Sequence, residues 1–437
     1  MIALIFLQLI VTILHAENWA VLVAGSRDID NYRHQSDVYR AYKILIKNGF
    51  PKDKVITMAF DDIATHVQNP FPGKVFNVPN GPDVYIGSDN IDYKGFDVTA
   101  SNFYAILEGD SGTTGGKKVL KSTKNDNVFI FFDDHGASGL LLFPQGPYAY
   151  AHDIGEHLRS MKKKEMFRNL LFYVESCNSG SLFSDLLLQD NNIYALTSAN
   201  SLQSSYAVFC GLKKYNAICL SCEFAQNWMS QSDKGNLKKI TVKDQYENVV
   251  KKTKMSKPCQ FGDKDLLQSK LSEFQSYSNS NDYLPEELSI ILDQVLNREQ
   301  NEQQNEQQGE RISQTQTHLM YLKQNSTDEE FEIIKNQVNA EQKRSNKLAS
   351  YLGIDNPNHN DVDKPQNMEL YKHSIETYED QCGRLNEFNL WFNTDILSEA
   401  IRIGIEVMVR CSIEGLNWNK LKESYPKFQQ ARCDYFP

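Results

Sequence analysis

Three stretches of the chain are continuously apolar and end in small or polar residues. They cover residues 19–25 (WAVLVAG), 128–134 (VFIFFDD) and 170–176 (LLFYVES). A strand with one solvated face alternates apolar and polar residues, whereas a run without alternation fits a strand buried on both faces, as in a parallel sheet. These stretches therefore predict three central strands of a mostly parallel sheet.

A helical pattern follows the first of these strands. Residues 36–48 carry apolar side chains at roughly helical spacing, and Gly49 stands where a glycine commonly ends a helix. Alternation of strands and helices is typical of an α/β fold with a doubly wound sheet. We expect this domain to span residues 17–290.

The chain changes character after this domain. Residues 297–310 read NREQNEQQNEQQGE, with almost nothing apolar to bury, so residues 291–325 are expected to form an exposed linker. Beyond them, Ser326 and Glu329 have the spacing of a capping box, and residues 390–410 mix apolar and polar positions at helical spacing. Residues 326–437 are therefore predicted to form a separate, small helical domain.

The first sixteen residues, MIALIFLQLIVTILHA, are apolar and end in the small residue Ala16. This pattern is typical of a secretory signal peptide, and the run is short for a membrane span. No other segment approaches the length of a membrane span. The formal net charge of −10 and the absence of a clustered Lys/Arg patch argue against a nucleic-acid partner.

The eight cysteines are expected to pair for the most part in an oxidising compartment. Cys219 and Cys222 have CxxC spacing, but no second CxxC or His pair completes a zinc site. A local disulfide, in which Cys210 can take part, explains this group better. If one of the eight is a reactive thiol, seven remain, so at least one more must be free.

His135 and Cys177 each follow directly after a predicted strand. Open α/β sheets place ligands and catalytic groups at the carboxyl ends of their strands, so adjacent strands bring these two residues together. A thiol attacks as a thiolate, and a nearby imidazole can take its proton and return one to the leaving amine. The small, polar residues around them, such as Gly136, leave backbone N–H groups free to face an oxyanion.

Several longer segments resemble the signatures of the legumain (asparaginyl endopeptidase) family, in the family's order. These segments are Asn31-Tyr32-Arg33-His34-Gln35, Asp133-Asp134-His135-Gly136, Tyr173-Val174-Glu175-Ser176-Cys177-Asn178-Ser179-Gly180-Ser181, and Ser204-Ser205-Tyr206. The resemblance covers most of residues 18–290 and continues more weakly to the C-terminus. It implies a caspase-like fold and a cysteine endopeptidase that needs neither a cofactor nor a metal ion.

The resemblance also implies a role for each catalytic residue. Cys177 is the nucleophile and His135 the general acid/base, with Asn31 orienting the imidazole. The backbone N–H groups of Gly136 and Cys177 form the oxyanion hole. The expected activity is hydrolysis of peptide and protein substrates after Asn, and after Asp at acidic pH.

An Asn side chain offers a carbonyl acceptor and an NH2 donor on one flat group. Arg33 can donate to the carbonyl, and acceptors for the amide are available on nearby acidic and hydroxyl residues. The resemblance places these S1-pocket residues together, namely Arg33, His34, Glu175, Ser204 and Ser205. One departure is that Cys222 stands where the family usually has a second acid, and the following residue, Glu223, can substitute only through a small backbone shift.

The resemblance further implies a zymogen. The C-terminal domain would cover the active site as an inhibitor, with a Cys382–Cys433 disulfide and Cys411 left free, and cystatin-type proteins would be further inhibitors. Self-cleavage is expected after Asn325, with Asn297, Asn301 and Asn305 as rival sites. Asn325-Ser326-Thr327 is also the chain's N-glycosylation sequon, and a glycan there would block the cut.

Other functions fit the same residues less well. The catalytic subunit of the GPI-anchor transamidase shares the Cys/His core, but it is normally held at a membrane and this chain lacks a C-terminal hydrophobic span. A catalytically impaired peptide-binding relative has no reason to keep His135, Asn31 and Arg33. A peptide ligase would use the same acyl-enzyme. The sequence therefore favours a protease of the secretory pathway, in a lysosome, in a vacuole or outside the cell.

Overall fold

The computed structural model describes residues 17–183, 192–216, 218–277, 310–313 and 372. Several predictions lie outside these residues: the signal peptide 1–16, nearly all of the linker and of the helical C-terminal domain, the Cys382–Cys433 pair with Cys411, and the cleavage site at Asn325.

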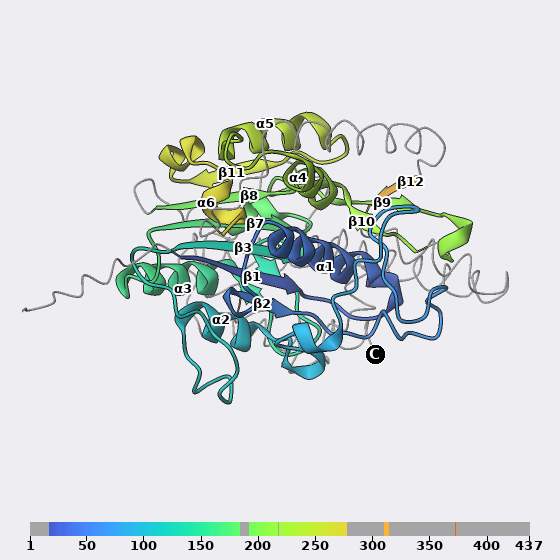
Figure 1. The fold of residues 1–437 in the computed structure, drawn as a ribbon, viewed down its shortest axis with the longest axis horizontal. Helices are drawn as coiled ribbons and strands as arrows, with labels where there is room; N and C mark the ends of the chain where they lie inside the picture. The colour runs from blue at the N-terminus through green and yellow to red at the C-terminus, as the bar shows by residue number, and fades with distance from the viewer. Residues whose placement is uncertain (1–16, 184–191, 217, 278–309, 314–371, 373–437) are drawn as a thin grey trace, which may run out of the picture.

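A six-stranded sheet forms the centre of the fold (Figure 1). Its strand order is β11-β8-β7-β3-β1-β2, and all neighbours are parallel except β11, which runs antiparallel to β8. The strands are β1 (Asn18–Ala24), β2 (Val55–Met58), β3 (Asn127–Asp133), β7 (Asn169–Glu175), β8 (Ile193–Thr197) and β11 (Cys259–Gly262). The three apolar stretches are therefore adjacent central strands, and the prediction of a mostly parallel, buried sheet is confirmed.

Helices cover both faces of this sheet (Figure 1). One face packs against α1 (Tyr32–Lys47), α4 (Glu223–Lys234), α5 (Val242–Lys252) and α6 (Ser272–Gln275). The other packs against α2 (Ala100–Glu108) and α3 (Ala151–Lys163). Each strand supplies both cores because successive side chains point to opposite faces.

The first helix begins earlier than its apolar periodicity indicates. It starts at Tyr32, four residues before the predicted start at residue 36. The extra turn carries Arg33, His34 and Gln35, which are polar and yet buried. At the other end Gly49 has a φ of +92°, so the glycine occupies the left-handed conformation that commonly follows a helix.

Two small sheets lie outside the central one. The first joins β4 (Gly136–Ala137), β5 (Leu140–Leu141) and β6 (Ala149–Tyr150), and the second has the order β10-β9-β12, from β10 (Ser221–Cys222), β9 (Tyr206–Cys210) and β12 (Glu310–Ser313). Short 3-10 helices occupy connections at Ile29–Asn31, Lys52–Lys54, Ser88–Asn90, Gly95–Asp97, Ser179–Leu182, Lys213–Tyr215 and Lys264–Gln268.

A disulfide joins Cys210 at the end of β9 to Cys219. This confirms the prediction of a local bond involving Cys210, whereas Cys222 of the CxxC pair is a buried free thiol. Among the described residues, no helix is both long and apolar enough to cross a membrane.

Candidate active site

The two central strands β3 and β7 end side by side. Asp133 and Glu175 are paired as the last residues of these parallel strands. His135 and Cys177 each follow two residues later. An added Cβ on Gly136 would lie 2.8 Å from the Cys177 carbonyl oxygen, so the chain after His135 packs directly against the Cys177 backbone. The structure thus brings together the two strand ends that sequence reasoning selected.

The imidazole of His135 is held by Asn31, which lies in the 3-10 helix just before α1. The Nε2 atom of His135 is 2.8 Å from Asn31 Oδ1, while Asn31 Nδ2 donates to the Arg27 carbonyl oxygen at 2.9 Å. A carboxamide oxygen only accepts hydrogen bonds, so His135 Nε2 must carry the proton. This tautomer leaves Nδ1 as the basic nitrogen of His135.

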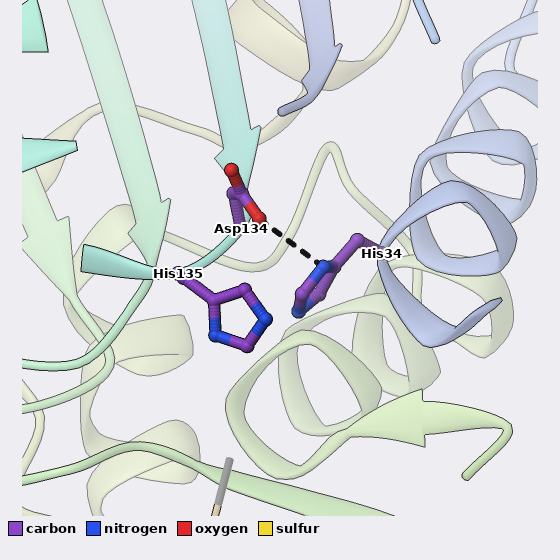
Figure 2. Close-up of side chains that lie close together, drawn as sticks. All are labelled: His34, Asp134 and His135. Atoms are coloured by element: carbon purple, nitrogen blue, oxygen red, sulfur yellow. Dashed lines mark ion pairs between the residues drawn. The ribbon is translucent and has the colours of Figure 1, made fainter. Parts of the chain in front are cut away.

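A second histidine supports this ring from α1. The rings of His34 and His135 meet edge to face with centroids 5.0 Å apart. Nδ1 of His34 lies 2.7 Å from Ser26 Oγ and 3.4 Å from Asp134 Oδ1, and Figure 2 shows the His34 ring facing Asp134, with the His135 ring beside it. His34 therefore packs as a fixed neighbour of His135 and is tied to the loops after β1 and β3.

The Cys177 thiol is buried beside the start of β9. Its sulfur accepts a hydrogen bond from the Ser205 backbone N–H at 3.4 Å and lies 3.9 Å from Ser205 Oγ. Burial raises the pKa of Cys177 to about 11, although hydrogen bonds from Ser205 and Ser204 oppose the shift. A thiol with this pKa keeps its proton near neutral pH, so it needs a nearby base to take that proton before it can attack.

Arg33 and Glu175 are both fully buried at the same edge of the sheet. Arg33 Nη1 donates to the Asp30 carbonyl oxygen at 2.9 Å, and Glu175 Oε2 accepts from the Ala225 backbone N–H at 3.4 Å. Burial raises the pKa of Glu175 to about 8, and Ser205 is among the residues whose hydrogen bonds oppose that shift. Glu175 and Ser205 therefore lie beside Cys177, and the charge of Arg33 acts on the nearby Asp133 and Cys222.

Cys222 and Glu223 point to different surroundings. The Cys222 sulfur lies 3.7 Å from Asp133 Oδ1. The Glu223 carboxylate accepts backbone N–H groups of Lys254 and Met255 at 3.2 and 3.1 Å, beyond the end of α5. Sequence analysis did not identify Asp133 as a site residue. A usable signal was available, because Asp133 ends an apolar run on the strand next to the one that ends at Glu175.

Two groups of side chains are of the types that bind metal ions. The possible ligand atoms of His34, Asp134 and His135, and those of His34, Asp133 and Cys222, lie within 4.8 Å of one another. The two histidines already have other partners, since His34 Nδ1 lies 2.7 Å from Ser26 Oγ and His135 Nε2 lies 2.8 Å from Asn31 Oδ1. Hydrogen bonds therefore hold both histidine rings in place within these groups.

β9 pairs with β10 along one edge and with an extended segment, β12, along the other. β12 pairs with it antiparallel, with Ser313 opposite Tyr206 and Ile312 opposite Ala207. The paired segment therefore runs toward Ser205, whose backbone N–H contacts the Cys177 sulfur. An extended peptide that paired with this edge of β9 would therefore pass close to the Cys177 thiol.

Comparison with known proteins agrees with this arrangement. Relatives include the vacuolar-processing enzyme delta-isozyme of Arabidopsis thaliana, 41% identical over 60% of this chain and 59% of its own length, and legumain of Mus musculus, 43% identical over 59% of each. The match thus spans about three fifths of these relatives. Caspase-1 from Spodoptera frugiperda aligns at 11% identity over 56% of this chain and 87% of its own, but its TM-score of 0.33 is too low to support an argument. Residues 18–277, more than half of the chain, match the profile of the Peptidase C13 family, and the chain belongs to that family.

Proposed function

We propose that the chain is a cysteine endopeptidase that hydrolyses peptide bonds after Asn, and after Asp at acidic pH. The observation that carries this proposal is the convergence of Cys177, Gly136 and the Asn31-held His135 at the ends of β3 and β7. Membership of the Peptidase C13 family supports it, as do relatives named legumain and vacuolar-processing enzyme.

The geometry supports a two-step acyl transfer. Nδ1 of His135 takes the thiol proton as the Cys177 sulfur attacks the substrate carbonyl carbon. The resulting oxyanion lies near the backbone N–H groups of Gly136 and Cys177. The intermediate collapses when His135 protonates the leaving amine, which leaves a thioester on Cys177. Water then attacks this thioester, with His135 accepting its proton, and the acid product and free thiol are released.

The residues around the thiol suit an Asn side chain at P1. The Arg33 guanidinium can donate to the carboxamide oxygen, and Glu175 can accept from the NH2 group. Ser204 and Ser205 lie beside Cys177, and His34 lies beside His135. Because the pKa of Glu175 is raised to about 8, its protonated form can also face an Asp side chain below that pH. The neutral fraction of the P1 Asp itself grows toward its ordinary pKa of about 3.9, so Asp should be accepted better as the pH falls.

We also propose that the chain is a zymogen that cuts itself after Asn325 and releases residues 326–437. The one residue described within that stretch, Lys372, places its Nζ atom 2.7 Å from Asp153 Oδ2 at the start of α3. This ion pair supports contact between the C-terminal stretch and the peptidase domain. Cleavage after Asn325 would occur in an acidic compartment of the secretory pathway, such as a lysosome or vacuole.

The activity is tested with fluorogenic peptides that differ only at P1, measured between pH 4 and 7 after acid activation. We expect Asn to be strongly preferred, with the Asp rate rising toward pH 4, and Cys177→Ala to abolish turnover and labelling by Asn-directed electrophiles. Labelling that persists on Cys222 or Cys259, or cleavage only after Arg or Lys, would refute the proposal.

The zymogen is tested by mass spectrometry of the acid-treated protein. A new N-terminus at Ser326 is expected in the wild type and not in Cys177→Ala, which serves as the matched control. Full activity of the uncut 437-residue chain, or a mature C-terminus only near Asn305, would contradict the proposed cut.

A further inference from the structure

The pair Asp133 and Glu175 gives the sheet edge two carboxyl groups on one face. Residues in register on neighbouring parallel strands point to the same side of a sheet. The residues two positions earlier, Phe131 and Tyr173, belong to the core under α1 and α4, so Asp133 and Glu175 point to that face as well. Arg33 reaches the same place from the first turn of α1 and stabilises the charge of Asp133.

Each of these two carboxyl groups has one oxygen that lacks a hydrogen-bond partner among the described residues. Asp133 Oδ2 and Glu175 Oε1 are buried and have no hydrogen-bond partner within the part of the chain that the structure describes. Buried polar atoms without a partner are costly and often mark a place where a ligand binds. The NH2 group of a carboxamide has two N–H donors, one for each of these oxygens.

Asp37 hydrogen-bonds to Asp133 and is itself held by several donors. Its carboxylate accepts from Asn77 Nδ2 at 2.6 Å, from Ser221 Oγ at 2.5 Å and from the Cys222 backbone N–H at 2.8 Å, and it hydrogen-bonds to Asp133. Burial, together with the charges of Asp37 and Glu175, raises the pKa of Asp133 well above its ordinary value. Asp37 thus has several partners within the protein, whereas Asp133 keeps one oxygen without a hydrogen-bond partner among the described residues.

We propose that Asp133 is a specificity-determining residue of the S1 pocket and that it, rather than Glu223, supplies the second carboxyl group beside Glu175 for the amide of a P1 Asn. This inference rests on the proposed function. The Cys222 sulfur lies 3.7 Å from the Asp133 carboxyl and offers only weak hydrogen bonds. The Oε2 atom of Glu223 accepts the backbone N–H groups of Lys254 and Met255, which hold that carboxylate against the segment after α5.

The test compares Asp133→Asn, which keeps the shape of the side chain, with Glu223→Gln as the matched control. We expect Asp133→Asn to lower kcat/KM for a P1 Asn peptide by about 100-fold. At pH 7 its preference for Asn over Asp should also fall, because the new amide can donate to an Asp carboxylate. Glu223→Gln should stay within about 3-fold of wild type. Alkylation of Cys177 by iodoacetamide, which needs no S1 pocket, should change little in either variant.

A rescue variant separates specificity from folding. Cys222→Asp in the Asp133→Asn background returns a carboxylate to a side chain that touches position 133, so P1 Asn cleavage should recover at least about 10-fold. Unchanged P1 selectivity in Asp133→Asn, or no recovery in the double variant, would overturn the inference. Wild-type protein that fails to cleave after Asn would instead refute the proposed function, so the two failures are distinguishable.

Discussion

The Nε2 atom of His135 lies 2.8 Å from the Oδ1 atom of Asn31. Asn31 is fixed in turn by the Arg27 carbonyl oxygen, so the amide cannot rotate without losing one of its two hydrogen bonds. The contact joins the loop after β3 to the residue before α1. It selects the tautomer in which His135 Nδ1 carries no proton and can act as a base.

Removing this contact should impair the base without disturbing the fold. We expect Asn31→Ala to lower kcat by about 10- to 100-fold, because the imidazole loses its orientation and its tautomer. The pH dependence of kcat should shift as well. Asn31→Asp keeps an oxygen that accepts from Nε2, so it should retain more activity than Asn31→Ala. Equal rates for wild type and Asn31→Ala would show that Asn31 does not position His135.

Gly136 follows the proposed base, His135, and packs against the backbone of the proposed nucleophile, Cys177. An added Cβ would lie 2.8 Å from both the Cys177 carbonyl oxygen and Ser176 Oγ. Gly136→Ala should therefore push the two strand ends apart and reduce kcat/KM by about 100-fold. Gly112→Ala is the matched control, since its Cβ meets only the exposed Asp110 carboxylate at 3.1 Å. Circular dichroism should be unchanged in both, and similar kinetics for both would refute the close-approach argument.

Much of this arrangement was accessible from the sequence because it depends on continuous apolar runs. The runs ending at Asp134 and Ser176 predicted buried parallel strands, and their ends placed His135 and Cys177 at one edge. The early start of α1 was missed because Arg33 and His34 are polar, and hydrophobic periodicity treats polar residues as solvated even when a site buries them.

The contacts of the candidate S1 pocket were harder to foresee. The register between β3 and β7 places Asp133 beside Glu175, and the contact of Asp133 with Cys222 depends on where β10 ends and α4 begins. Local sequence pattern determines neither. The same holds for Glu223, whose carboxylate accepts a backbone hydrogen bond from Lys254, about thirty residues later in the chain. Local sequence also could not decide between Cys210 and Cys222 as the partner of Cys219.

The raised pKa of Glu175 predicts that stability depends on pH. Its pKa rises from 4.5 to about 8 on folding, because burial disfavours the charged form. Between these values the folded protein binds a proton that the unfolded chain has lost, so this contribution is full below pH 4.5 and is lost as the pH rises to about 8. Within that window the free energy of unfolding should fall by up to about 1.4 kcal/mol per pH unit.

The measurement is thermal unfolding from pH 4.5 to 8 in the Cys177→Ala background, which prevents self-cleavage. Tm should fall across this range, and Glu175→Gln should flatten the dependence and raise Tm near pH 8. Glu156→Gln is the control, since Glu156 lies exposed on α3 and should not alter the slope. A Tm that rises with pH, or a slope that Glu175→Gln leaves unchanged, would contradict the burial argument.

The last prediction concerns β12, which occupies the edge of β9 that leads to Cys177. If substrates add to the same edge, residues 310–313 must leave before a peptide can bind. Successive N–H groups of a strand point to opposite sides, so prolines at both Arg311 and Ile312 remove at least one N–H that faces β9. Uncut protein with Arg311→Pro and Ile312→Pro should therefore react faster with an Asn-directed electrophile, by about 10-fold. Alanine at both positions keeps the N–H groups and should leave the rate near that of wild type, whereas equal rates in the proline and alanine variants would show that β12 does not block the path to the thiol.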